Sequence, residues 1–522
     1  MKKLNILFFL LIPFIKQAQY IEWVQQYHNL YKTNAQTVAT DKNKNVYVAG
    51  SYSGDDHAHS PYVQGMFLRK YNPAGILKWS KTYDNIEIAD IAIDTIGKVF
   101  ITGYIHPGAH FGNFASINQT GSFYASINAD GNETFFQSLK NTKSGMTTIT
   151  FDKNNNYYLC GPFNDTLTFS CNTLLNPASP GNYGLFIIKY NSDNQCLWAK
   201  QTHGGCVVRS YYNKFVFDNE DNFYVSGQNF GSVSFDPNHT IVAQGADNTF
   251  IAKYDINGNV LWIKNIGTAT NGGQEEITSI TCDKYGNVWA TGSYDSDLII
   301  DGSYLSSNNT YFPKPFLIKL DKSGVCISAT QDNYSYAIIN GAYYKYGGVN
   351  APGIYNNVNL QSGFYIMRCD TNWNGLYAFQ PPVYGGFTVD EDDNLYLTGG
   401  FSGTADFGKG NILTGNMDMF IAKYSPPLAL GIKKQISDLN EINIYPNPTA
   451  NIFTISFSSA QTVSQLQINV IDALGKTVYT ETTTAFTGSL KKEINLSGLS
   501  KGTYVIKLSS QDFIETKKIV VE

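Results

Sequence analysis

A phrase that recurs along most of the chain limits what this sequence can fold into. Its clearest copy, Phe215–Ile266, begins FVFDNEDNFYVSG and ends FIAKYDINGNVLWIKNI. The apolar runs have the β-branched and aromatic content of strands. The two segments between them, DNEDN and DINGN, are rich in Asp, Asn and Gly, which predicts tight turns. One copy therefore predicts a four-stranded antiparallel meander with two short turns and one long polar connection.

Seven copies of this phrase are found in the sequence. A sheet of this kind has two faces to bury, and copies stacked around a ring bury both. The sixth copy departs most from the pattern, because Asn340-Gly341, a favoured hairpin turn, replaces its acidic turn. The sequence therefore predicts an all-β fold with a seven-bladed β-propeller over residues 20–424. The copies are Val38–Tyr83, Ile91–Leu139, Ile149–Thr202, Phe215–Ile266, Ile280–Gln331, Tyr336–Gln380 and Phe387–Tyr424.

The last copy lacks its fourth strand, because Pro426 and Pro427 follow it and proline cannot continue a strand ladder. The missing strand has a counterpart at the other end of the chain. Residues 20–29 read YIEWVQQYHN, which resembles ILKWSKTYDN of the first copy and belongs to no other copy. We therefore expect the N-terminal strand to complete the last blade and remove its free edge. The Trp of each outer strand is expected to cover the neighbouring blade.

The first 19 residues predict a signal peptide. Lys2 and Lys3 precede an apolar run, Leu4–Ile15, which is too short to span a membrane and is interrupted by Pro13. No cysteine follows the expected cleavage end, which argues against a lipoprotein. No later stretch is apolar enough for a transmembrane segment. The net charge of −5 provides no basic field, so nucleic acid is not expected as a partner.

The chain changes character after the seventh copy. Residues 425–440 contain two prolines and no β alternation, which indicates a linker. Residues 441–522 then contain short alternating strands separated by turn signals. This pattern predicts a small immunoglobulin-like β-sandwich.

Four motifs of this C-terminal part carry a specific resemblance: IYPNPT, VIDALGKTV, INLSGLSKGTYVIKL and the terminal KKIVVE. In this order they resemble the type A C-terminal sorting domain of type IX secretion cargo. The resemblance implies a Gram-negative bacterium, contact with the secretion machinery, removal of the domain near the linker, and attachment of the remainder to the outer membrane. The alternative is an ordinary immunoglobulin-like carbohydrate-binding or adhesion module. The motif residues are Pro446, Asn447, Pro448, Gly475, Lys476, Gly502 and Tyr504.

The repeats also resemble a named family, the seven-bladed propeller repeat of secreted bacterial proteins. The shared patterns are D-x-x-G-N-x-Y-V-x-G and F-x-x-K-Y-x-x-x-G-x-x-x-W, from which the second and sixth copies depart. That family is defined by its architecture, so it implies no single activity.

Two sets of side chains are candidates for metal binding on this chain. An Asp opens the first turn of nearly every copy, but the spacing lacks that of an EF-hand loop, so turn capping is favoured over calcium. Residues of two adjacent long connections could hold zinc or another transition metal, with solvated loop histidines as the alternative. The sequence shows no partner for His28, His203 or His239. The first set is Asp41, Asp94, Asp152, Asp218, Asp283 and Asp390; the second is Asp55, His57, His59, His106 and His110.

The sequence contains seven cysteines, four of them in or near the third copy. In an oxidising compartment they predict one or two local disulfides, with isolated buried thiols as the alternative. No CxxC, G-x-S-x-G or P-loop motif is present, so no catalytic residue and no cofactor are expected.

Three functions remain open from the sequence. The favoured one is a secreted or cell-surface propeller that binds a protein or glycan through its long connections. The second is a secreted hydrolase or lyase with acidic or metal groups at the channel mouth. The third is a structural or adhesion component of the cell envelope.

Overall fold

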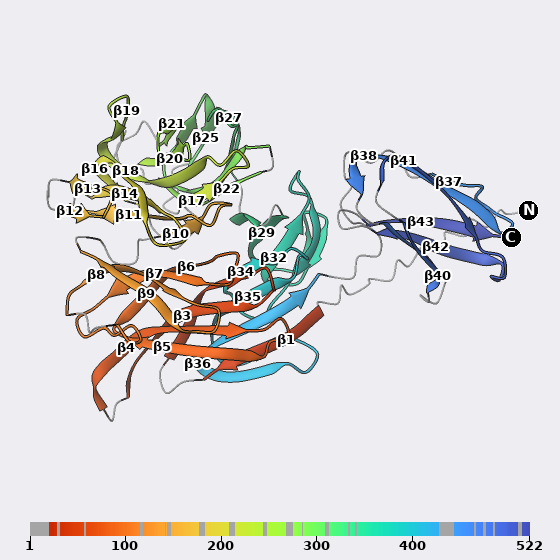
Figure 1. The fold of residues 1–522 in the computed structure, drawn as a ribbon, viewed down its shortest axis with the longest axis horizontal. Helices are drawn as coiled ribbons and strands as arrows, with labels where there is room; N and C mark the ends of the chain where they lie inside the picture. Colours follow the sequence, from red (N-terminus) through yellow and green to blue (C-terminus); the bar gives the residue numbers. More distant parts are fainter. Residues whose placement is uncertain are drawn as a thin grey trace, which may run out of the picture. The chain divides into compact units, whose positions relative to one another are not determined.

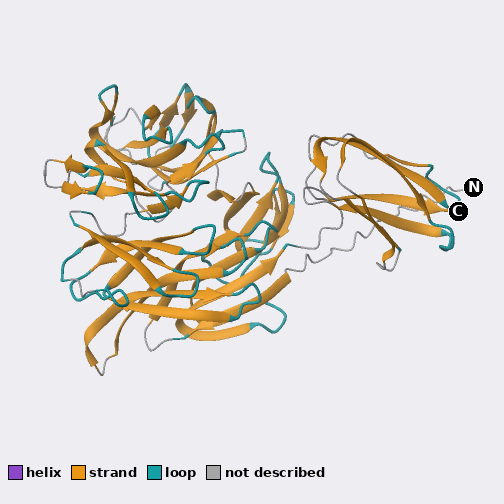
Figure 2. Ribbon diagram, viewed as in Figure 1, coloured by secondary structure: helices purple, strands orange, loops and turns teal. Residues whose placement is uncertain are grey.

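The computed structural model is built of β-strands, and no helix is found in its described part (Figure 2). This confirms the predicted all-β fold class. Two compact units divide the chain, residues 1–426 and residues 427–522. The structure describes residues 20–28, 32–56, 59–114, 118–140, 142, 148–176, 183–207, 215–243, 248–267, 275–283, 285–307, 313–331, 335–339, 342–426, 443–463, 466–472, 477–483, 486–509 and 514–522. The predicted signal peptide and the Asn340-Gly341 turn lie outside these residues.

Seven antiparallel sheets, each built on four strands, follow one another through the described part of the first unit (Figure 1). They match the seven sequence copies in order. The fourth sheet also carries β16 (His203–Val207) and β19 (His239–Val242), which pair with its second strand. The sheets consist of β2 (Lys32–Thr40), β3 (Val46–Asp56), β4 (His59–Tyr71) and β5 (Leu77–Asp84); β6 (Ile86–Ile93), β7 (Val99–Ile105), β8 (Gly121–Ile127) and β9 (Glu133–Leu139); β10 (Thr148–Phe151), β11 (Tyr157–Phe163), β14 (Gly184–Tyr190) and β15 (Cys196–Gln201); β17 (Phe215–Phe217), β18 (Phe223–Asp236), β20 (Asn248–Tyr254) and β21 (Val260–Ile266); β22 (Glu275–Cys282), β23 (Val288–Tyr294), β26 (Lys314–Leu320) and β27 (Cys326–Gln331); β28 (Ser335–Ile339), β29 (Ala342–Val349), β32 (Gly363–Cys369) and β33 (Gly375–Phe379); and β34 (Gly386–Val389), β35 (Leu395–Asp406), β36 (Ile412–Ser425) and β1 (Tyr20–Tyr27).

The seventh sheet is completed by the N-terminal strand, as the sequence predicts. β1 pairs antiparallel with β36, with Trp23 opposite Lys423 and Gln26 opposite Phe420. In Figure 1 the red β1 lies beside the light blue β36, so the two ends of the first unit share one sheet. Lys423 also forms an ion pair with Glu22 at 2.6 Å.

Neighbouring sheets share buried apolar clusters throughout the first unit. Each of six clusters joins a sheet to the next one, and a seventh joins the last sheet to the first. In that closing cluster, Val48 and Phe67 of the first sheet pack with Met419 and Ile421 of β36. The first strands also lie next to one another from β2 to β28, and β34 lies beside β2. The row of sheets therefore closes on itself.

In four of the seven sheets, a tryptophan of the fourth strand contacts the following sheet: Trp79, Trp198, Trp262 and Trp23. The indole Nε1 of Trp79 donates to the backbone oxygen of Ala129 in the second sheet, at 3.1 Å. Trp23 of β1 makes the equivalent bond to Pro73 of the first sheet, at 3.0 Å. Its ring lies on Gly75, where an added Cβ would stand 2.6 Å from Trp23 Cδ2. The tryptophan contact therefore spans the junction between the seventh and first sheets as well.

The long connections between second and third strands differ from expectation. The sequence indicates polar inserts without strands, but six of the seven connections contain an added hairpin, either separate or as an extension of the blade strands. Their alternate apolar side chains, such as Leu167 and Phe169, are buried. The segments are too short and too polar overall to be recognised as strands from sequence. The separate hairpins are β12 (Asp165–Thr168) with β13 (Thr173–Asn176), β24 (Leu298–Ile300) with β25 (Ser303–Leu305), and β30 (Gly353–Tyr355) with β31 (Val358–Leu360).

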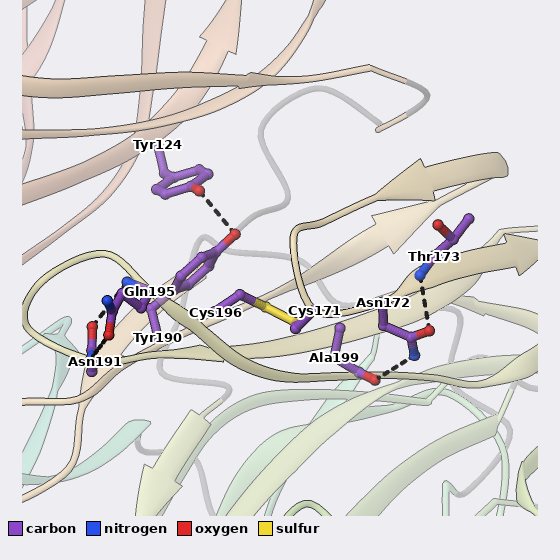
Figure 3. The surroundings of a disulfide bond; sticks show 9 residues. All are labelled: Tyr124, Cys171, Asn172, Thr173, Tyr190, Asn191, Gln195, Cys196 and Ala199. Carbon is purple, nitrogen blue, oxygen red and sulfur yellow. Dashed lines mark hydrogen bonds between the residues drawn. A yellow bond between two sulfur atoms is a disulfide. The ribbon is translucent and has the colours of Figure 1, made fainter.

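These hairpins lie along the outer, fourth strands and cover part of their free edges. In the third sheet the amide of Gln201 both donates to and accepts from the backbone of Leu175, at 2.7 and 2.8 Å. A disulfide between Cys171 and Cys196 joins the same hairpin to β15 (Figure 3). The sequence predicts one or two local disulfides near the third copy, and the structure contains this one. The other five cysteines are free thiols in the structure: Cys160, Cys206, Cys282, Cys326 and Cys369.

The second unit consists of two sheets with a shared core. One sheet has the order β37-β38-β41 and the other β40-β39-β42-β43. Phe453 and Ile494 of the first sheet pack with Ile468, Ile506 and Ile519 of the second. This is the two-sheet packing of a β-sandwich. Its strands are β37 (Asn443–Tyr445), β38 (Ile452–Val463), β39 (Leu466–Ile471), β40 (Thr477–Thr483), β41 (Phe486–Asn495), β42 (Gly502–Ser509) and β43 (Ile514–Val521).

The junction between β1 and the first sheet yields a stability prediction. We expect Trp23→Ala to lower the free energy of unfolding by about 3 kcal/mol, because a large ring and its hydrogen bond are lost. Gly75→Ala is expected to destabilise the native chain, since Gly75 has a φ of 77° and Trp23 occupies the Cβ position. Urea denaturation of the single and double variants measures both effects.

The double variant separates the two contributions, because the steric clash at residue 75 disappears when Trp23 is absent. Ile96→Ala is the control, since Ile96 is a turn residue that is 77% exposed. Equal costs for Gly75→Ala with and without Trp23 would contradict the proposed contact.

Candidate functional site

The two sides of the first unit's sheets differ in their connections. The first-to-second and third-to-fourth turns are short and lie on one side, which we call the turn side. The second-to-third connections and the links between sheets lie on the other side, the connection side. Ligand sites on folds of this kind concentrate in long connections, so the connection side is where a binding site is expected.

The acidic residues of the turn side serve as caps. Asp218 Oδ1 accepts the backbone N–H groups of Glu220 and Asn222, both at 2.9 Å. Its Oδ2 accepts from Tyr224 Oη at 3.1 Å and pairs with Lys253 Nζ at 3.0 Å. These contacts confirm the predicted capping role. They also occupy the carboxylate oxygens that calcium would need. The same pair of backbone bonds is found at Asp41, Asp94, Asp152, Asp283 and Asp390.

The lysine of each F-x-x-K-Y strand belongs to the same arrangement. Lys253 Nζ lies 4.9 Å from the ring centre of Tyr224, and Lys189 lies 5.0 Å from that of Tyr158. Lys189 also pairs with Asp152 at 3.3 Å. The repeated Asp, Tyr and Lys therefore stabilise the sheets and are not free to bind a ligand.

The predicted histidine site is only partly described. Asp55 and His59 lie at the tip of the β3–β4 hairpin, His57 lies outside the described residues, and nothing is shown of the side chains at this tip. His106 Nε2 lies 2.7 Å from Glu87 Oε1, and His110 is exposed. In the described part of the chain, no three His, Cys, Asp or Glu side chains are grouped as metal ligands. Zinc binding by this set stays a prediction.

The structure supplies partners for the three histidines that had none in the sequence. His28 Nδ1 lies 3.0 Å from Asp418 Oδ1, across the β1–β36 pair. His239 Nδ1 lies 2.8 Å from Asp236 on the same hairpin, and His203 contacts Gln201 at 3.2 Å. Asp236 is three residues from His239 and Gln201 is two residues from His203, so these two pairs are local in sequence, whereas His28 and Asp418 are not.

Asp90, on the first strand of the second sheet, is a buried carboxylate with a raised pKa. Asp90 of β6 accepts from Thr148 Oγ1 at 2.7 Å and from the N–H groups of Ile149 and Ile91 at 3.1 and 2.9 Å. Burial raises the pKa of Asp90 to about 6, although these three hydrogen bonds lower it. Two of the three partners belong to β10, so this group links the second and third sheets.

The motif residues of the second unit hold its last strand. Asn447 Nδ2 donates to the backbone oxygen of Lys518 at 2.9 Å, and Asn447 Oδ1 accepts from the N–H of Val520 at 3.0 Å. Tyr504 Oη donates to the oxygen of Ser500 at 2.7 Å. Pro446 and Pro448 flank Asn447, Gly502 begins β42, and Gly475 and Lys476 lie outside the described residues.

The family comparison matches this unit. A family model described as the secretion system C-terminal sorting domain covers residues 443–522. Residues 443–522 are a type IX sorting domain. The sorting domain marks the protein as secreted or attached to the cell surface, as the sequence predicts. It also implies an interaction with the secretion machinery. Among the described residues, no helix is long and apolar enough to cross a membrane.

More distant similarities were found for the rest of the chain. An uncharacterized WD repeat-containing protein of Acanthamoeba polyphaga mimivirus is 23% identical over 485 residues, which covers 77% of this chain but only 32% of that protein. A protein of unknown function from Bacteroides caccae is 11% identical, with a TM-score of 0.28 and coverage of 57% and 82% of the two chains. A copper-bound fungal alcohol oxidase is 10% identical, with a TM-score of 0.38 and coverage of 96% and 98%. Such low TM-scores support no conclusion about activity.

The capping role of Asp218 yields a prediction about pH. Hydrogen bonds from Lys253 and Asn222 outweigh burial and lower the pKa of Asp218 below its ordinary value. A lowered folded-state pKa stabilises the fold above the unfolded value of about 3.9, and this contribution is lost as the pH falls through the folded pKa. We expect Asp218→Ala to cost about 3 kcal/mol at neutral pH, because Lys253 is left buried without its partner.

Denaturation at pH 7 and pH 3 measures this dependence, and the difference between Asp218→Ala and the native chain should shrink at the lower pH. Asp218→Asn is the matched control, because Asn72 caps an equivalent turn in the first sheet. It should cost less than Asp218→Ala. Protection of the native chain by added calcium, lost in both variants, would contradict a purely capping role.

Proposed function

We propose that this protein is a secreted or surface-displayed β-propeller that binds a protein or glycan through the connection side of its sheets. The sorting domain carries the first half of this proposal, because it marks an exported protein. The closed row of sheets supports the second half. Every sheet presents its long connection on the same side, so the ring offers one continuous surface built from seven variable segments.

The distribution of chemistry favours binding over catalysis. The recurring charges are used in caps and ion pairs on the turn side. On the connection side, Tyr384 in the link between the sixth and seventh sheets is 68% exposed. Phe364 supports it in an edge-on arrangement, with ring centres 4.8 Å apart. A supported, exposed aromatic ring provides a platform for a sugar face or an apolar side chain.

This platform yields a binding prediction. In a glycan-array and protein-capture screen of the full mature chain, Tyr384→Ala should weaken binding by about tenfold, as expected for loss of an aromatic anchor. Tyr285→Ala is the matched control, because Tyr285 is 69% exposed but lies on a first-to-second turn. The Tyr285 variant should bind like the native chain. Equal losses in both variants, or none in either, would contradict binding on the connection side.

The sorting domain yields a prediction about export. Deletion of residues 442–522 should leave the remaining chain in the periplasm, because the segment read by the secretion machinery is gone. Fractionation and immunoblotting of periplasm, outer membrane and medium measure the outcome. Circular dichroism of the retained chain should show a folded β protein, which excludes misfolding as the cause. Appearance of the truncated chain in the medium would refute the assignment.

A further inference from the structure

A small pocket lies between the third and fourth sheets, away from the Tyr384 platform. Its volume is about 110 Å³. The third sheet contributes residues of β14 and β15 to its walls, and the fourth contributes the end of the β18 hairpin and the β20–β21 turn. Its apolar side includes Leu185, Ile187 and Phe235. Its polar side includes Lys200, Asp236 and Tyr254.

Tyr254 is a buried polar residue of this pocket, only 3% exposed. At the corresponding position of two other copies, Tyr190 Oη bonds with Tyr124 Oη at 2.9 Å (Figure 3), whereas Tyr424 Oη is buried without a partner. No hydrogen-bond partner of Tyr254 Oη is found among the residues that the structure describes, although this residue lines the pocket. The hydroxyl is not fully enclosed by protein atoms, so it faces the pocket and is available to a ligand.

Two charged groups complete the polar side of the pocket. Asp236 accepts from His239 Nδ1 and from the N–H of Asn238, both at 2.8 Å. Burial, which raises its pKa, is outweighed by these bonds, so the pKa of Asp236 is lowered and the group is a carboxylate at neutral pH. The exposed Lys200, which also lines the pocket, supplies N–H donors. The pocket thus offers a fixed acceptor, a cationic donor and a hydroxyl that can act as either.

We propose that the pocket between the third and fourth sheets binds one terminal sugar unit of a glycan. Adjacent sugar hydroxyls can each donate and accept, so they match Asp236, Tyr254 and Lys200 together. The apolar wall formed by Leu185, Ile187 and Phe235 suits the C–H face of a sugar ring. The volume is smaller than that of an engineered cavity of about 150 Å³ that binds benzene, so one sugar ring enters only in part. An oligosaccharide is too large to enter, so only a chain end fits.

A free amino acid is the competing ligand, since its ammonium and carboxylate could pair with Asp236 and Lys200. It is disfavoured because a zwitterion would pair its charges at the partly exposed rim. The buried hydroxyl of Tyr254 would then remain without a partner. A neutral polyol reaches all three polar groups without burying a charge of its own.

The test is a ligand-observed NMR titration of the full mature chain. The probes are methyl glycosides of neutral hexoses and pentoses, and glycine and alanine represent zwitterions. A dissociation constant on the order of 1 mM is expected for one sugar ring, because the contact area is small. Tyr254→Phe should weaken binding about fivefold, since one hydrogen bond is lost. Asp236→Asn should weaken it about tenfold, since a charged acceptor is lost.

Tyr424→Phe is the matched control variant. Residues 420–424 and 250–254 share the sequence FIAKY, and Tyr424 Oη is buried without a partner. Tyr424 does not line the pocket, so its variant should bind like the native chain. The melting temperatures of both phenylalanine variants should not fall, because neither loses a bond within the protein.

The outcomes are decisive in each direction. Glycoside binding that Tyr254→Phe weakens and Tyr424→Phe leaves unchanged would support the site. Absence of glycoside binding, equal binding in Tyr254→Phe, or binding of the zwitterions alone would overturn it. The Tyr384 platform can fail independently, because Tyr384→Ala should leave this monosaccharide binding intact.

Discussion

The pairing of β1 with β36 is the constraint on which the first unit depends. Without β1, the seventh sheet would lack its fourth strand, and the closing contact of Trp23 with the first sheet would be missing. The remaining sheets would still stack, but one edge of β36 would be open to solvent or to another chain. Closure therefore joins residues separated by almost the full length of the unit, which makes the ring dependent on both of its ends.

The repeated polar residues follow from the same requirement. Each short turn must satisfy its own backbone groups, and the capping Asp does this in almost every sheet. In the third and fourth sheets, a lysine that also lies over an aromatic ring pairs with that carboxylate. These charged side chains therefore stabilise the sheets. Function is expected at side chains that the scaffold does not use in this way, such as the Tyr254 hydroxyl or the exposed Tyr384 ring.

Much of this organisation could be predicted from sequence, because it is local and periodic. The DNEDN and DINGN turns, the F-x-x-K-Y strands and the orphan strand at residues 20–29 each carry a signal within ten residues. The added hairpins were missed, because Leu167 and Phe169 are two apolar residues in a short polar segment. The pocket could not be predicted at all, since Lys200, Asp236 and Tyr254 come from different strands of two sheets. The sorting domain was recognisable from its motifs, while the role of Asn447 in holding β43 required the structure.

The central claim, that the N-terminal strand completes the last sheet, can be tested by complementation. A mature chain beginning at residue 29 is titrated with a synthetic peptide of residues 20–28, and thermal unfolding is followed by circular dichroism. The account predicts that the shortened chain melts at a lower temperature and that the peptide restores the native value in a saturable manner. A peptide carrying Trp23→Ala should restore it poorly. A shortened chain that is as stable as the native one, and indifferent to the peptide, would contradict the closed row of sheets.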